Sequence, residues 1–127
     1  MSRNVHISLI ALLLAGCVAA PTRSDPGAFR SLQSGRVPMG SVSAFTDCLM
    51  DGFGSAHYAL TNAVARQQRR SDGYRVETTT NGGVLVSADV LDTGHVELFE
   101  SSASALINTA GEREAFARCL SRFREAR

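Results

Sequence analysis

The apolar residues of this chain change their spacing twice along the sequence, and this pattern limits the folds that it can adopt. Over residues 43–54 they recur at helical spacing. Over residues 74–98 they alternate with polar residues, which predicts strands, and over residues 116–123 the helical spacing returns. A helix, a run of strands and a final helix favour an α+β fold over a parallel sheet.

Each predicted helix carries one apolar stripe that contains a cysteine. The stripes are Phe45, Cys48, Leu49 and Phe53 in the first helix, and Phe116, Cys119, Leu120 and Phe123 in the last. Thr109 and Glu112 fit a capping box at the start of the last helix. Its arginines, Arg113, Arg118, Arg122 and Arg124, are predicted to face away from the stripe. We therefore expect both helices to pack on one face of the sheet.

Three strands are predicted between the helices. Their inward rows are Tyr74, Val76 and Thr78, then Val84, Val86, Ala88 and Val90, then Val96 and Leu98. Asn81-Gly82 predicts a hairpin turn because both residues tolerate a positive φ, and Asp92-Thr93-Gly94 predicts a second turn. The result is a three-stranded antiparallel meander, and its acidic positions suggest that one face is exposed to water.

The segment before the first predicted strand has two interpretations. Residues 56–70 are rich in alanine and contain neither glycine nor proline, which suits a second helix, but their polar end also suits a loop. Arg66, Arg69 and Arg70 are interpreted as a solvated end of this segment, and contact with lipid head groups or acidic glycans is the alternative.

Residues 1–16 have the layout of an export signal. Arg3 supplies a positive start, and the apolar stretch from Ile7 to Ala15 is too short to span a membrane as a helix. Leu14-Ala15-Gly16-Cys17 then resembles the lipobox of bacterial lipoproteins. This resemblance implies cleavage before Cys17, attachment of a diacylglycerol to its thiol and acylation of the new amino group with a fatty acid such as palmitate.

The same resemblance implies a place in the cell. A triacylated Cys17 would anchor the protein to a membrane of the cell envelope. Enteric lipoproteins with Asp at the next position stay at the inner membrane, so Val18 favours the outer membrane, with the domain facing the periplasm. Secretion after cleavage near Val18-Ala19-Ala20 and an uncleaved helix are the alternatives. The overall layout is similar to that of small uncharacterised lipoproteins of Gram-negative bacteria.

Residues 17–42 are expected to connect the lipid to the domain as a flexible tether. All three prolines lie in this segment, among serine, glycine and arginine and without sustained periodicity. The alternative is an ordered arm that packs on the domain through Phe29, Leu32 and Val37. Residues 43–127 are then predicted to form one small α+β domain.

Two cysteines remain once Cys17 carries the lipid. Cys48 and Cys119 lie on the two helical stripes, and an exported protein folds in an oxidising compartment, so we expect a disulfide between them. The alternative is two buried free thiols. A metal site is not expected, because no histidine stands near either cysteine at zinc-ligand spacing.

Composition argues against nucleic acid as a partner. The 127 residues include 13 arginines, no lysine and 12 acidic residues, which gives a formal charge of +1, and only 6% of the residues are aromatic. The chain has neither the excess of basic residues that binds phosphates nor many aromatic side chains that could stack on bases. Cleavage before Cys17 would remove Arg3 and leave the side chains without net charge.

No motif in the sequence predicts a catalytic or cofactor site. Val90-Leu91-Asp92-Thr93-Gly94 resembles the signature of retroviral-type aspartic proteases, but His95 departs from that pattern and too little chain follows for the rest of such a subunit. His57 and His95 are interpreted as structural histidines, with general-base roles as the alternative. Ser55 lacks the surroundings of a nucleophile elbow.

The sequence therefore favours a membrane-anchored, non-enzymatic envelope lipoprotein that acts as an interaction or structural module. The expected partner is an envelope protein or the cell wall, bound through an open sheet face or by strand addition. A displayed inhibitor of a lysozyme or protease is the alternative, and a small hydrolase is a third possibility.

Overall fold

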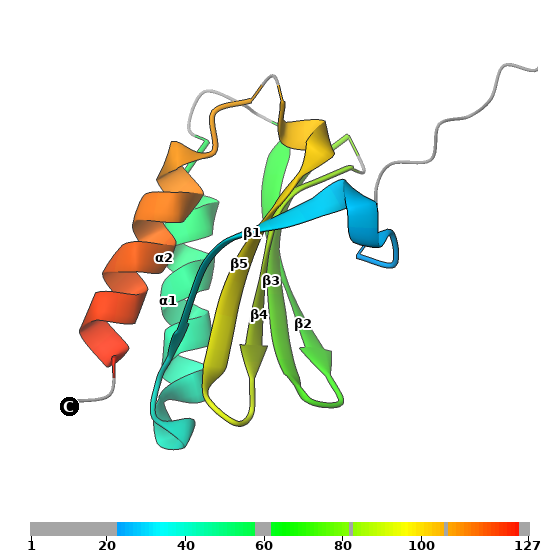
Figure 1. Cartoon of the computed structure of the whole chain (residues 1–127). Helices are drawn as coiled ribbons and strands as arrows, with labels where there is room; N and C mark the ends of the chain where they lie inside the picture. Colours follow the sequence, from blue (N-terminus) through cyan, green and yellow to red (C-terminus); the bar gives the residue numbers. More distant parts are fainter. Residues whose placement is uncertain (1–22, 58–61, 82, 106, 125–127) are drawn as a thin grey trace, which may run out of the picture.

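Two helices pack against one face of a five-stranded sheet in the computed structural model, which describes residues 23–57, 62–81, 83–105 and 107–124 (Figure 1). The elements in chain order are η1 (Pro26–Ala28), β1 (Phe29–Arg36), η2 (Met39–Ser41), α1 (Val42–Gly54), β2 (Ala63–Arg70), β3 (Gly73–Thr80), β4 (Gly83–Leu91), β5 (His95–Ser101), η3 (Ser102–Ser104) and α2 (Ala110–Phe123). This α+β class confirms the sequence prediction.

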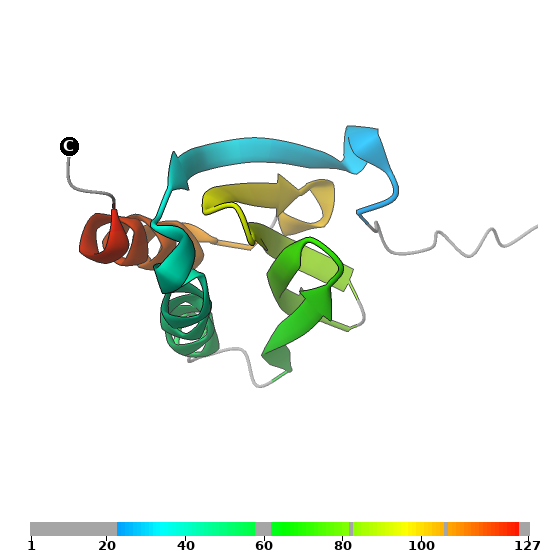
Figure 2. The ribbon, with the colours of Figure 1, turned by 90° about the horizontal axis from the view of Figure 1, so that it is seen from below.

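The strands lie in the order β1-β5-β4-β3-β2, and all neighbouring pairs are antiparallel. The predicted three-stranded meander is wrong in its number of strands. The three predicted strands are β3, β4 and β5, whereas β2 extends the sheet beyond β3 and β1 extends it beyond β5. Figure 2 shows both helices on the same side of the curved sheet.

The prediction of a flexible tether up to residue 42 is wrong for residues 23–42. Strand β1 pairs with β5 along its length, and Val37, immediately after it, is fully buried in the core. Leu32 packs against that core and Phe29 is half-buried. The alternative of an ordered arm through these three residues is confirmed. The folded domain therefore begins before residue 43. Residues 29–36 show little periodicity of their own, but pairing with β5 holds them in the sheet.

Residues 63–70 form an edge strand, so neither a helix nor a loop describes them. Their pairing with β3 is regular from Ala63 opposite Thr80 to Arg70 opposite Gly73. Glutamine and arginine have good intrinsic helix propensity, but the short hairpin after Arg70 places this segment beside β3, where pairing overrides that preference. The earlier part of the ambiguous segment, residues 58–61, lies outside the described residues.

The core lies between the sheet and the two apolar helix stripes. Phe45 and Phe116 are fully buried and meet edge to face with ring centroids 5.8 Å apart. A disulfide joins Cys48 of α1 to Cys119 of α2, as predicted, with a Cα–Cα distance of 6.0 Å. Burial of each large apolar side chain contributes about 1.5–3 kcal/mol. Arg113, Arg118 and Arg122 of α2 and Arg124, which follows it, are exposed, as expected.

The close approach of the helices depends on a glycine. A Cβ atom at Gly52 of α1 would lie 2.5 Å from the Cβ of Ala115 on α2, so a larger residue would push the helices apart.

The predicted turns are also present: Asn81 has a φ of 49° and Gly94 a φ of 92°. Between them β4 carries a bulge at Leu85, which buries this side chain and was not predicted.

Candidate functional site

The sheet face opposite the helices is partly covered by the N-terminal arm. Arg23 reaches across this face: its Nη2 lies 2.6 Å from Oδ2 of Asp89, and its Nη1 donates to Oγ of Ser87 at 2.9 Å. Its guanidinium carbon is 4.0 Å from the ring centroid of Phe99 and 5.5 Å from that of Phe29. We call this set of side chains the Arg23 clamp.

The Arg23 clamp is continued on β3 by a second arginine. The Nε of Arg75 lies 2.9 Å from the other carboxylate oxygen of Asp89, so one carboxylate holds two guanidinium groups. The side chains of Arg23 and Arg75 are only 15% exposed, and Ser87 is fully buried. A charge-assisted pair with this little exposure is screened less than a surface pair. The expectation of a water-exposed face is therefore wrong at its centre.

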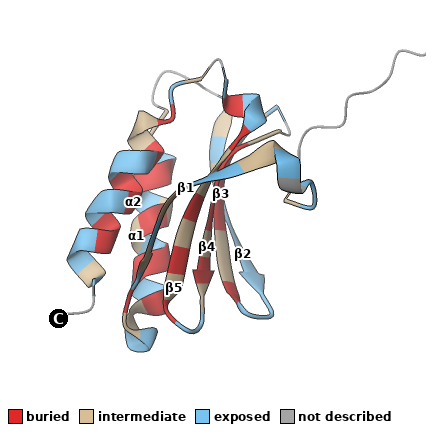
Figure 3. Cartoon of the chain, in the orientation of Figure 1, coloured by how far each residue is buried: buried red, intermediate tan, exposed pale blue. Residues whose placement is uncertain are grey.

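The outer edge of β2 is the second feature of interest, and it lies at the opposite margin of the sheet from β1. All residues from Arg66 to Arg70 are exposed, and Val64 is 52% exposed (Figure 3). The strand contains three arginines and no acidic residue. Since β2 pairs only with β3 within the described sheet, one side of its backbone carries unpaired N–H and C=O groups on alternate residues.

One arginine of this edge is held in place. Both Nη atoms of Arg69 bond the carboxylate of Asp92, at 2.9 and 3.1 Å, and its guanidinium lies 4.8 Å from the centroid of the Tyr74 ring. The hydrogen bond from Arg69 holds the pKa of Asp92 below its ordinary value. Asp92 of the protease-like Val90-Leu91-Asp92-Thr93-Gly94 motif is thus an exposed ion-pair partner in a tight turn.

The β1 edge is less regular. Its pairing with β5 shifts between Ser31 and Gln33, which leaves Leu32 as a bulge. A bulge bends and twists a strand and makes an edge a poorer template for a further strand. Of the two edges in the described sheet, β2 is therefore the better suited to pairing.

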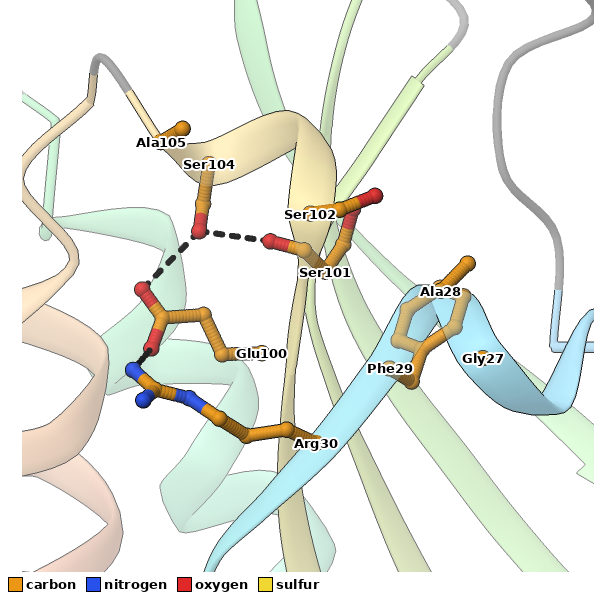
Figure 4. Close-up of a pocket in the computed structure, with 9 residues that line it drawn as sticks. All are labelled: Gly27, Ala28, Phe29, Arg30, Glu100, Ser101, Ser102, Ser104 and Ala105. Atoms are coloured by element: carbon orange, nitrogen blue, oxygen red, sulfur yellow. Dashed lines mark hydrogen bonds and ion pairs between the residues drawn. The ribbon is translucent and has the colours of Figure 1, made fainter.

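A shallow cavity of about 270 Å³ lies where β1 begins and β5 ends (Figure 4). Glu100 lies on one side of it and bonds Arg30 at 3.0 Å, Ser104 at 2.9 Å and Thr109 at 3.1 Å. Burial raises the pKa of Glu100, but these hydrogen bonds outweigh it and hold the pKa below its ordinary value. The carboxylate is therefore kept as an anion by structural partners.

Glu112 has a different partner from the one predicted. Thr109 makes no side-chain capping bond at α2 and donates to Glu100, while Asn108 accepts from the backbone N–H of Ala110. The Glu112 side chain is fully buried and pairs with Nε2 of His57, which follows α1. The predicted capping box is therefore wrong, because this buried pair takes the carboxylate.

The remaining predicted residues are separated from one another. His95 begins β5 and lies 3.5 Å from Glu97, on the helix-free face, while His57 is buried near the helix ends. Ser55 bonds the backbone of α1. Cys17, the predicted lipidation site, lies outside the described residues.

Sequence reasoning missed the Arg23 clamp and the free edge. Arg23 stands in a Pro- and Ser-rich segment, and nothing local indicates Asp89 as its partner, 66 residues away. The alternation of Ala63 and Ala65 with exposed neighbours was the available signal for β2, although it is short and weak.

No protein-family model, curated protein or solved structure is found to match this chain. Among the described residues, no helix has both the length and the apolar character needed to cross a membrane, and no cluster of three or more His, Cys, Asp or Glu side chains could hold a metal ion.

Proposed function

We propose that this chain is a lipid-anchored, non-enzymatic protein of the cell envelope that presents the β2 edge to a protein partner close to the membrane. The lipobox-like Leu14-Ala15-Gly16-Cys17 supports attachment of the lipid to Cys17. Val18 supports the outer membrane as the site of anchoring, with the domain on the periplasmic side. The Cys48–Cys119 disulfide is in keeping with an oxidising compartment.

The observation that carries this proposal is the position of Arg23. It is fixed on the sheet by Asp89 and Ser87, and only residues 18–22 separate it from Cys17. Six peptide steps reach at most about 20 Å. A lipid on Cys17 would therefore hold the domain near the bilayer surface and restrict how it can turn, which suits the display of one edge to a neighbouring membrane protein.

The β2 edge is the surface that we assign to the partner. It offers backbone groups for strand addition and side chains of one sign of charge, and the sheet is supported from behind by α1 and the disulfide. Strand addition derives affinity from main-chain hydrogen bonds, and side chains on the added strand give specificity.

Photo-crosslinking in intact cells tests this function. A photoreactive amino acid replaces Gln68 on β2, and the matched control carries it at Arg113, an exposed position on α2. We expect the Gln68 variant to form one defined adduct with another envelope protein, and the Arg113 variant to form none. The adduct should disappear when Cys17→Ser releases the protein from the membrane. Equal adducts at both positions, or adducts that do not depend on Cys17, would contradict the proposal.

A further inference from the structure

The charge of β2 and its regular pairing with β3 also indicate the chemistry of the partner that binds at this edge. The strand runs for eight residues without proline and without a shift in register against β3. Its side chains add three positive charges, and no acidic residue lies within the strand. Natural sheets protect their edges with charges, prolines or bulges, and β2 has the charges but neither a proline nor a shift in register.

The side chains of β2 divide between the two faces of the sheet. Gln67 pairs with buried Val76, and Arg69 pairs with Tyr74, so these two residues belong to the helix side. Val64, Arg66, Gln68 and Arg70 alternate with them and lie on the helix-free side. An added strand would thus meet, on one face, an apolar residue, an arginine, a glutamine and an arginine in turn.

These arginines are not equally neutralised by β3. Arg66 lies opposite Glu77, whereas Arg70 lies opposite Gly73, so no β3 side chain faces Arg70. Gln68 lies opposite Arg75, which is held by Asp89. On the helix-free side, β3 therefore offers an acidic side chain opposite Arg66 and none opposite Arg70. Directly opposed side chains of paired strands lie about 4.5–5.5 Å apart at Cβ, which is close enough for carboxylates to pair with these guanidinium groups.

From this arrangement we propose that the partner of the β2 edge is an acidic segment in extended conformation. It adds as a sixth strand and places carboxylates opposite Arg66 and Arg70. A second copy of this chain fits less well, because pairing two β2 strands would bring three arginines from each copy to one edge. This inference rests on the proposed function and specifies the chemistry of its partner.

A synthetic peptide tests the proposal. The probe is a capped, fluorescent octapeptide of alternating valine and glutamate, and the control probe replaces glutamate with lysine. The protein is the full chain purified in a neutral detergent. We expect the glutamate peptide to bind, more weakly at high salt, and the lysine peptide not to bind. Hydrogen exchange should slow at β2 amides and remain unchanged in β1.

Two matched pairs of substitutions separate the edge from general charge. Arg66→Ser with Arg70→Ser should weaken binding of the glutamate peptide about three- to tenfold, as expected for two exposed ion pairs. Arg113→Ser with Arg118→Ser changes the charge equally on α2 and should leave binding unchanged.

A proline on β2 tests the backbone contribution. The loop between Arg70 and Gly73 has two residues, and this register places the backbone N–H and C=O of Gln67 on the side away from β3. Gln67→Pro should therefore prevent binding of the added strand while retaining the fold.

Several results would overturn the proposal: equal binding of both peptides, protection away from β2, or unchanged affinity in the Arg66/Arg70 variant. Concentration-dependent dimers that protect β2 would assign the edge to a second copy. Binding to anionic vesicles that requires Arg66 and Arg70 and leaves β2 amides unprotected would assign it to lipid head groups. The peptide assay does not depend on Cys17, so loss of the lipid anchor and failure of the acidic-strand proposal remain distinguishable.

Discussion

Among single residues, Arg23 joins the N-terminal arm to the sheet through contacts with Phe29, Ser87, Asp89 and Phe99. Arg23→Ala should lower the free energy of unfolding by about 1–3 kcal/mol, because charge-assisted hydrogen bonds at a partly buried site are lost. Arg30→Ala is the control: its side chain is 75% exposed in its pair with Glu100, and such pairs contribute about 0–1 kcal/mol. Urea denaturation measures both, and equal effects would contradict the role of the clamp.

Glu112 provides a second prediction at this scale. Its carboxylate is buried against His57, so Glu112→Ala should destabilise the protein by about 3 kcal/mol or more through loss of a buried pair. Glu114→Ala on the exposed side of the same helix should change stability by less than about 0.5 kcal/mol. Thermal or urea unfolding of the two variants decides between a structural pair and a dispensable contact. A small effect at Glu112 would contradict the structural role.

Glu100 gives a prediction about pH. Its hydrogen bonds lower its pKa in the folded protein, so it contributes stability above the ordinary glutamate pKa of about 4.3, and this contribution is lost as the pH falls through the lower folded value. Glu100→Gln should therefore be less stable than the unmodified protein at about pH 7 and should approach its stability at about pH 3. A stability difference that is constant with pH, measured by urea denaturation, would contradict this assignment.

Among the elements, the two helices depend on their disulfide. Cys48 and Cys119 are 71 residues apart in sequence, and closing a loop of this length stabilises a fold by about 4 kcal/mol in the chain-entropy model. The Cys48→Ser/Cys119→Ser variant should lose about this amount in urea denaturation. The unmodified protein should lose a similar amount when a reductant is added, and the variant should not respond to reductant. No loss on reduction would contradict this role.

The elements predicted from sequence are those with strong local signals. The stripes around Phe45 and Phe116 predict α1 and α2, and the turns at Asn81 and Gly94 predict the boundaries of β4. Strands β1 and β2 have no such pattern, because edge strands are half-exposed and gain their stability from one neighbour only. Local sequence patterns therefore predict the three central strands, β3, β4 and β5, and miss the two edge strands, β1 and β2.

At the scale of the whole molecule, the candidate site is assembled from segments that are distant in sequence. The clamp joins the arm to β4, and the free edge exists because β1 pairs with β5 and leaves β2 at the other margin. Among the long-range contacts, the disulfide was predicted from the sequence, since matching helix stripes and an even cysteine pair indicate it. The charge of Arg66 and Arg70 was visible in the sequence, but their place on an open edge requires the topology.

Intact mass of the protein extracted from membranes tests the central claim, that a lipid on Cys17 holds this domain at the membrane. The predicted result is a chain that begins at residue 17, carries a diacylglycerol and a further acyl group, and lacks the two hydrogens lost when Cys48 and Cys119 form a disulfide. Cys17→Ser should abolish both the mass increment and the membrane association. A full-length or unlipidated mass in the unmodified protein would contradict the claim.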